Sequence, residues 1–178
     1  WPDDGYWSSI IEGLKNRYPD NANYSNPWLQ DPTRPKLAQN FLKSDNPGVV
    51  MTYAEVEFLL AEAKLKGWNV GSETVEQHYE KGVRAAMAFL NDNYDCDIQE
   101  DDINDYINNR SISSLSDEGK KEAINTQAWI LHFHNPSECW ANVRRSGYPK
   151  LKSPAEYGYA ADKLTGGYDI PVRLCYPI

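Results

Sequence analysis

Apolar and polar positions divide the chain into a helical middle and two irregular ends. From about residue 51 to residue 146, apolar residues recur at intervals of three and four, as in helices that bury one face. Residues 1–50 lack this period and are rich in Pro, Asn, Asp and aromatic residues, and residues 147–178 are irregular as well. The pattern predicts an all-α protein with a loop-rich arm (1–50), a helical body (51–146) and a loop followed by an extended strip (147–178).

Two helices joined by a short turn open the helical body. Thr52-Tyr-Ala-Glu55 has the spacing of a capping box and predicts a helix that ends near Lys66-Gly67. Its apolar stripe consists of Val56, Leu59, Leu60 and Ala63. A second helix is predicted over 74–93, and its apolar face consists of Tyr79, Val83, Ala86, Met87 and Leu90. Such a hairpin is the repeat unit of tetratricopeptide-like arrays, although the strict tetratricopeptide signature is absent.

Three more helices are predicted in the rest of the body. A short one covers 103–109, and a long one covers about 117–134 with Ile124, Ala128 and Leu131 on one face. Asn135-Pro-Ser-Glu138 predicts the start of the last helix, which Gly147 ends. Stacked hairpins need neighbours on both sides, so we expect either an exposed apolar patch or a second chain that covers it.

The composition excludes several classes of function. A net charge of −8 argues against binding to a phosphate backbone, and no apolar run approaches the roughly 20 residues of a membrane span. The three cysteines cannot all pair with one another, and there is no Cys-x-x-Cys. The chain shows no phosphate loop, Gly-x-Ser-x-Gly or nucleophile constellation, so we expect no cofactor and no catalysis.

Two groups of residues are candidates for metal ligands. His132 and His134 are two positions apart, so on a helix their side chains point about 200° apart and cannot chelate one ion. The acidic segment 95–105 lacks the glycine and glutamate spacing of an EF-hand, which leaves a loose calcium site as the lesser alternative to a solvated acidic loop. We therefore expect no metal site.

Three stretches in order resemble the SusD/RagB family of outer-membrane nutrient-binding lipoproteins. They are 35–40 with VVMTYAEVEFLLAEA (49–63) and Gly67-Trp68, then ECWANVRRSGYP (138–149), and then IPVRLCYP (170–177). Order and spacing are similar to the C-terminal part of that family over nearly the whole chain. The Glu and Asn positions that usually follow Tyr-Pro are missing, as are the lipid-bearing cysteine and the first hairpins. The resemblance implies that residues 1–178 are the C-terminal portion of a single, longer SusD-like domain.

The resemblance also implies a function. Family members face outward on the outer membrane, bind glycans or other nutrients, and close over a TonB-dependent transporter without catalysing a reaction. The expected partners are therefore a glycan or other nutrient and the transporter, with no nucleic acid and with a lipid anchor outside this chain. Two other functions remain open from the residues: a helical protein-binding scaffold and, less favoured, a glycoside hydrolase, which needs two carboxyl groups across a cleft.

The residues of the motifs are expected to be structural. Glu55 suits the first turn of its helix, and Glu62 is a candidate for an ion pair with Arg144 or Arg145. A packed junction between the last helix and the terminal strip is favoured over a ligand site for the group that consists of Trp140, Arg144, Arg145, Tyr148, Arg173 and Tyr176.

The aromatic residues of the arm are the candidates for ligand binding. Sugar rings stack their apolar faces on Trp and Tyr, and nearby Asn, Asp and Arg side chains bind the hydroxyl groups. The ligand-binding prediction covers Tyr6, Trp7, Tyr24, Trp28 and Arg34. The alternative is that these rings attach an irregular arm to the helical body.

Overall fold

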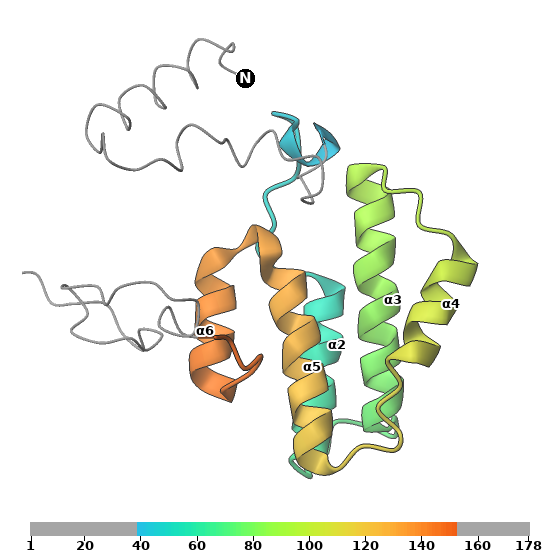
Figure 1. Ribbon diagram of the computed structural model, residues 1–178, viewed down its shortest axis with the longest axis vertical. Helices are drawn as coiled ribbons and strands as arrows, with labels where there is room; N and C mark the ends of the chain where they lie inside the picture. The colour runs from blue at the N-terminus through green and yellow to red at the C-terminus, as the bar shows by residue number, and fades with distance from the viewer. Residues whose placement is uncertain (1–38, 153–178) are drawn as a thin grey trace, which may run out of the picture. The chain divides into compact units, whose positions relative to one another are not determined.

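The computed structural model describes residues 39–152, which contain five α-helices and no strand (Figure 1). The all-α prediction is therefore confirmed for this part of the chain. The chain divides into two units, Trp1–Ser44 and Asp45–Ile178. Of the first unit, the described part holds the short 3-10 helix η3, Gln39–Leu42. Most of the predicted arm and nearly all of the terminal strip lie outside the described residues.

Helices α2 (Tyr53–Leu65) and α3 (Val75–Tyr94) form the predicted hairpin. The Thr52 side chain accepts a hydrogen bond from the backbone N of Glu55 at 3.2 Å, as the capping pattern predicts. A reciprocal capping box forms at the start of α3, where Thr74 and Gln77 each accept a bond from the other's backbone N. Each helix of the hairpin thus begins at a side-chain cap encoded in its own sequence.

The second half of the body contains α4 (Glu100–Asn109), α5 (Asp117–Leu131) and α6 (Pro136–Ser146). The predicted helix 117–134 ends early, because the 3-10 helix η4 (His132–His134) replaces its last turn. Asn135 caps α6 by accepting from the backbone N of Glu138 at 3.4 Å. Gly147 ends α6 with φ of +77°, a left-handed conformation that glycine adopts without strain.

The core lies where α2 packs against α3 and α5 (Figure 1). Helix α6 packs along the other side of α5, and α4 packs against α3. Phe58 and Tyr79 are at the centre of the core, with ring centroids 6.2 Å apart. The other buried members of this cluster are Ala61, Val83, Ile112, Ile124 and Ala128.

The predicted apolar stripe of α2 is wrong about which face the helix buries. The buried residues of α2 are Ala54, Glu57, Phe58, Ala61 and Glu62. Helix α2 carries apolar residues on two sides, so its periodicity fits two faces equally well. The core selects the face that includes Phe58 and the small residues that let α3 and α5 approach.

The predicted stripe instead lines a groove of about 420 Å³ on the outside of the hairpin. Leu59 is 46% exposed at this groove, and Trp68, just after α2, is 64% exposed. The apolar lining consists of Val56, Leu59, Leu60, Ala63, Trp68 and Val70. An exposed apolar face of this kind is what the stacked-hairpin pattern predicts for a layer without its neighbour. No helix among the described residues combines the length and the apolar character needed to cross a membrane.

Candidate functional site

Seven predicted site residues lie outside the described range. They are the five arm residues Tyr6, Trp7, Tyr24, Trp28 and Arg34, and the two strip residues Arg173 and Tyr176. Their roles stay predictions. The other motif residues lie on α2, on α6 and just after α6, and they can be followed atom by atom.

The two adjacent arginines of α6 have different partners. Arg145 donates to Glu62 of α2 at 2.6 Å, which is the ion pair anticipated for one of the two arginines. Arg144 instead lies over the ring of Trp140, with its guanidinium carbon 4.6 Å from the ring centroid. Successive helical positions point in different directions, so one arginine ties α6 to α2 while the other stacks along α6 itself.

Arg145 belongs to a polar junction that joins α2, α5 and α6. Its second terminal nitrogen donates to Asn125 of α5 at 3.0 Å and to Asn142 of α6 at 3.2 Å. The Asn142 amide in turn donates to the backbone O of Asn125 at 2.9 Å. Asn125 is fully buried, so these bonds satisfy groups that would otherwise lack partners inside the protein. We call Glu62, Asn125, Asn142 and Arg145 the polar junction.

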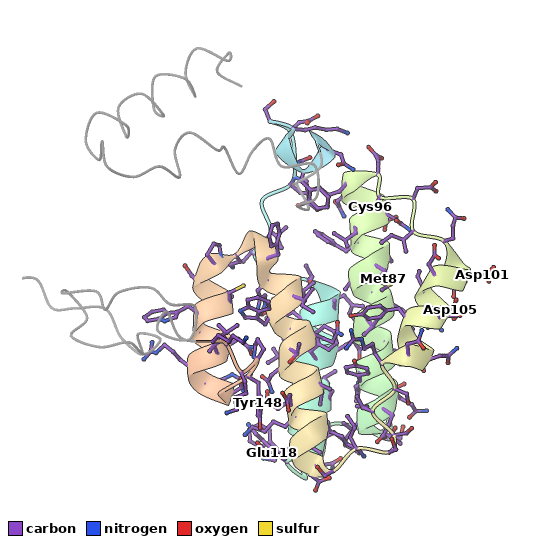
Figure 2. All side chains as sticks on the ribbon, viewed as in Figure 1. Met87, Cys96, Asp101, Asp105, Glu118 and Tyr148 are labelled. Carbon is purple, nitrogen blue, oxygen red and sulfur yellow. The ribbon has the colours of Figure 1, made fainter. Side chains whose placement is uncertain are left out.

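The turn after α6 is attached to the start of α5. The Tyr148 hydroxyl donates to the Glu118 carboxylate at 2.7 Å, and the two side chains meet near the N-terminal end of α5 (Figure 2). The backbone N of Tyr148 donates to the Ser146 hydroxyl at 3.0 Å, and the following peptide bond to Pro149 is cis. The hydrogen bond to Glu118 is the main cause that raises the pKa of Tyr148. These contacts attach the Gly-Tyr-Pro turn to α5 and α6.

The pKa of the Glu62 carboxyl group is strongly shifted in the polar junction. Burial by itself raises the pKa of Glu62, but hydrogen bonds from Arg145 and Lys66, with their positive charges, outweigh burial and lower the pKa from 4.5 to about 2. Lys66 lies 2.7 Å away on the same helix. The carboxylate therefore stays charged at any pH at which the protein is expected to work.

Acid should weaken the fold through Glu62. A carboxyl group with a lowered pKa in the folded state stabilises that state above its unfolded value, and this stabilisation is lost as the pH falls from 4.5 towards 2. The Arg145 and Lys66 side chains are 45% and 51% exposed, so solvent screening limits the loss to about 1–2 kcal/mol. Urea unfolding at pH 5.5 and pH 2.5 should show this difference between the native chain and Glu62→Gln. Equal pH dependence in the two proteins would contradict the assignment.

Trp140 lines an aromatic groove on α5, η4 and α6. Its ring is partly buried among the described residues. Phe133 is 63% exposed at the same groove, which has a volume of about 440 Å³. The lining consists of Trp129, Ile130, Phe133, Pro136, Cys139, Trp140, Val143 and Leu151.

Trp140→Ala should lower the free energy of unfolding by about 1–2 kcal/mol, less than the 3–5 kcal/mol typical of a fully buried tryptophan. The substitution removes the apolar contacts of a partly exposed ring and the stacking of Arg144 on it. Thermal and urea unfolding measure the change, and Phe133→Ala serves as a control at an exposed ring of the same groove. A loss of glycan binding with unchanged stability would mean that Trp140 contacts the ligand instead.

Glu55 has a second role beyond the first turn of α2. Its carboxylate lies 3.5 Å from Nε2 of His132 in η4. The two side chains line a small cavity of about 140 Å³ between α2, α5 and α6, next to the polar junction. This contact links the start of α2 to the end of α5. The helix has ended before His132, so the expected geometry of His132 and His134 on a continuous helix does not apply.

Sequence reasoning missed several buried polar residues. Glu57 and His78 are each 3% exposed and face each other across the hairpin, and Asn125 and Asn142 hold the polar junction. Glu57 and His78 have a weak signal in the sequence, because each lies next to an aromatic core residue on its helix. The two asparagines have no such signal, since a helix pattern does not show which amides find buried partners.

The fold and the polar junction define a class of protein that is built from helical hairpins. In this class the motif residues hold the helices together. A family model described as "Starch-binding associating with outer membrane" matches residues 10–177. The chain belongs to this SusD-like family. The resemblance seen in the three sequence motifs is thereby confirmed.

Two solved structures are similar to the chain. A Bacteroidetes AC2a SusD-like protein is 48% identical, with a TM-score of 0.73 over 96% of this chain and 32% of its own length. A chitin-binding protein is 32% identical, with a TM-score of 0.62 over 74% of this chain and 27% of its own length. This chain thus spans about a third of these relatives. No curated protein matches it.

Proposed function

We propose that this chain is part of a non-catalytic glycan-binding protein that works on the outer face of the outer membrane. The observation that carries the proposal is the match of residues 10–177 to a family described as starch-binding and associated with the outer membrane. A similar solved structure is named a chitin-binding protein, which supports a polysaccharide ligand. The proposal includes a lipid anchor outside this chain and delivery of the glycan to a TonB-dependent transporter.

The pairing of carboxylates supports binding without catalysis. Glycoside hydrolases need two carboxyl groups that face each other across an open cleft. Among the described residues, Glu62 is bound to Arg145, Glu76 to Lys120, and Glu118 to Tyr148 and Lys121. These three carboxylates are held by cations or a hydroxyl group within the helical body, which supports a structural role for them.

The proposed ligand contacts come from the arm. Its aromatic and polar residues have the side chains that stack on sugars and bind hydroxyl groups. The polar junction is engaged within the helical body and supplies no open ring for stacking. We therefore propose Tyr24, Trp28 and Arg34 as the main contacts, with Tyr6 and Trp7 as further ones.

Calorimetric titration of the longest soluble form of the protein with chitin and starch oligosaccharides tests the proposal. Binding is expected, and chromatography after long incubation should recover the oligosaccharides intact. Trp28→Ala should weaken binding about tenfold or more, as expected for the loss of a stacking ring worth more than 1.4 kcal/mol. Phe133→Ala removes an exposed ring of the helical body and should leave binding unchanged.

Three outcomes would overturn parts of this proposal. Release of shorter sugars would show an enzyme, and binding of peptides in place of glycans would show a protein-interaction scaffold. Unchanged affinity in Trp28→Ala together with weakened affinity in Phe133→Ala would move the ligand site from the arm to the aromatic groove.

A further inference from the structure

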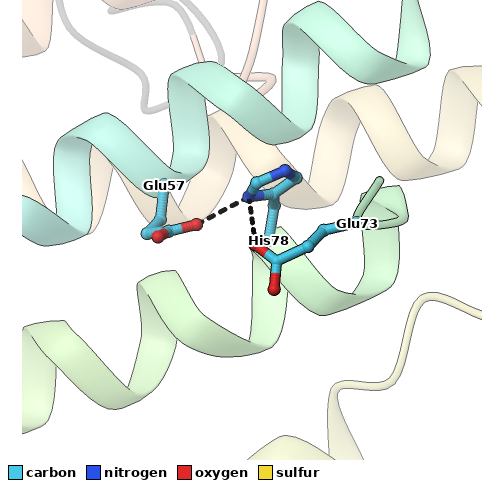
Figure 3. A group of neighbouring side chains, drawn as sticks. All are labelled: Glu57, Glu73 and His78. Carbon is cyan, nitrogen blue, oxygen red and sulfur yellow. Dashed lines mark hydrogen bonds and ion pairs between the residues drawn. The ribbon is translucent and has the colours of Figure 1, made fainter. Parts of the chain in front are cut away.

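Three potential metal ligands meet inside the α2–α3 hairpin, away from the polar junction. Glu57 lies on α2, His78 lies on α3, and Glu73 lies in the connection just before α3 (Figure 3). Nδ1 of His78 is 2.7 Å from an Oε of Glu57 and 3.8 Å from an Oε of Glu73. One donor atom from each residue lies within 4.8 Å of the others. Three electron-pair donors from three segments of the chain therefore converge on one point.

The imidazole of His78 forms a hydrogen bond with only one of the two carboxylates. A single N–H at Nδ1 serves Glu57, while Glu73 faces the same nitrogen at a distance too long for a hydrogen bond. Two carboxylates that approach one nitrogen repel each other unless a cation offsets their charge, and Lys81, which pairs with Glu73, is the cation that does so in this structure. The His78 and Glu57 side chains are each 4% exposed, so water screens this repulsion weakly.

The far side of the imidazole ring does not fix the tautomer. Nε2 of His78 is buried and has no hydrogen-bond partner among the described residues. Without an ion, the hydrogen bond to Glu57 keeps the proton on Nδ1. When an ion binds, the proton resides on Nε2 and the Nδ1 lone pair points at the ion between the two carboxylates.

We propose that Glu57, Glu73 and His78 bind one divalent transition-metal ion, with Zn²⁺ as the best match. An imidazole nitrogen with two carboxylate oxygens is a ligand set that zinc accepts, and water completes the coordination. This site departs from the expectation of no metal drawn from the sequence. Its residues come from two helices and a connection, and no spacing motif marks them. The proposal is independent of glycan binding.

Lys81 is the competing cation at this site. Its ammonium group pairs with Glu73, and the two side chains are 43% and 37% exposed. Both can rearrange at the surface, so a metal ion can displace Lys81 and reach the site from solvent. Glu57 cannot move in this way, because it is buried. Metal binding therefore exchanges a flexible surface ion pair for coordination that links α2, α3 and their connection.

Removal of single ligands should weaken zinc binding in the full chain. Chelator-treated protein is titrated with Zn²⁺ by calorimetry, and Co²⁺ absorption in the visible range reports the coordination geometry. One ion per chain and an increase in melting temperature are expected. His78→Gln should weaken binding by about 100-fold or more and Glu73→Gln by about tenfold or more, because each removes a ligand and even the loss of an outer-shell partner costs about 10- to 100-fold. Lys81→Met should tighten binding, because it removes the competing charge.

Controls keep the proposal open to refutation. Glu80 lies on α3, as His78 does, and its carboxylate pairs with Arg84. Glu80→Gln should therefore leave zinc affinity unchanged. If His78→Gln fails to fold, the partly exposed Glu73 and Lys81 variants decide the question. The proposal is overturned by an absence of stoichiometric Zn²⁺ binding. It is equally overturned if Glu73→Gln and Lys81→Met bind zinc as the native chain does.

Discussion

Replacing Phe58 with alanine should lower the free energy of unfolding by about 3–5 kcal/mol, the largest effect that we predict for this chain. The ring is 2% exposed and lies between Tyr79 and the backbone of α3. Truncation removes its apolar contacts and leaves a cavity at the point where α2, α3 and α5 meet. Urea unfolding followed by circular dichroism measures the loss.

Gly82 provides a matched test of the same contact. A Cβ atom at this position would lie 2.5 Å from the Phe58 ring, closer than any real contact. Gly82→Ala alone should therefore cost about 1–3 kcal/mol through overpacking. The same substitution in a Phe58→Leu background should cost much less, because the smaller side chain leaves room for the new methyl group. Additive losses in the double variant would argue against the close packing of Phe58 on α3.

Arg145→Met should lower the free energy of unfolding by about 2–3 kcal/mol. The substitution leaves the Glu62 carboxylate, whose side chain is 7% exposed, with Lys66 as its remaining cation. It also removes the guanidinium group that donates to the side-chain oxygens of Asn125 and Asn142 inside the polar junction. The loss is below the 3–5 kcal/mol of a fully buried pair, because the Arg145 side chain is 45% exposed.

Arg144→Met is the natural control, since it changes the neighbouring residue and removes the same charge. Its guanidinium stacks on Trp140, so the expected loss is about 0.5–1 kcal/mol. In Arg145→Met, the stability difference between pH 5.5 and pH 2.5 should also shrink, because the pKa of Glu62 then lies closer to its ordinary value. Equal losses of unfolding free energy from the two substitutions would show that the net charge sets the stability and that the contacts of the polar junction do not contribute.

The apolar period and the capping residues were sufficient to predict the helices. Thr52, Asn135 and Gly147 each mark a helix boundary within one residue of the observed end, because caps satisfy backbone groups locally. The three motifs in order, around 49–63, 138–149 and 170–177, were sufficient to indicate the SusD-like family, which the family model over residues 10–177 confirms. A candidate ion pair between Glu62 and one of the two adjacent arginines was visible too, because both belong to the sequence motifs and have opposite charges.

The choice of buried face on α2 depended on tertiary packing. Phe58 and Leu59 are adjacent and equally apolar, yet one lies in the core and the other is 46% exposed. Only the shapes of α3 and α5, including the bare backbone at Gly82, decide which of them is enclosed. The distinct roles of Arg144 and Arg145 were decided in the same way, by which helix each side chain reaches.

The meeting of Glu57, Glu73 and His78 is the clearest case of a feature that the tertiary structure decides. Helical periodicity describes one helix at a time, and these residues face one another only after α2 folds back on α3. Local sequence thus determined where helices begin and end and to which family the chain belongs, because caps, periods and motifs act over short distances. Which polar groups meet inside the body was decided by the packing of helices, because those contacts join positions up to 83 residues apart.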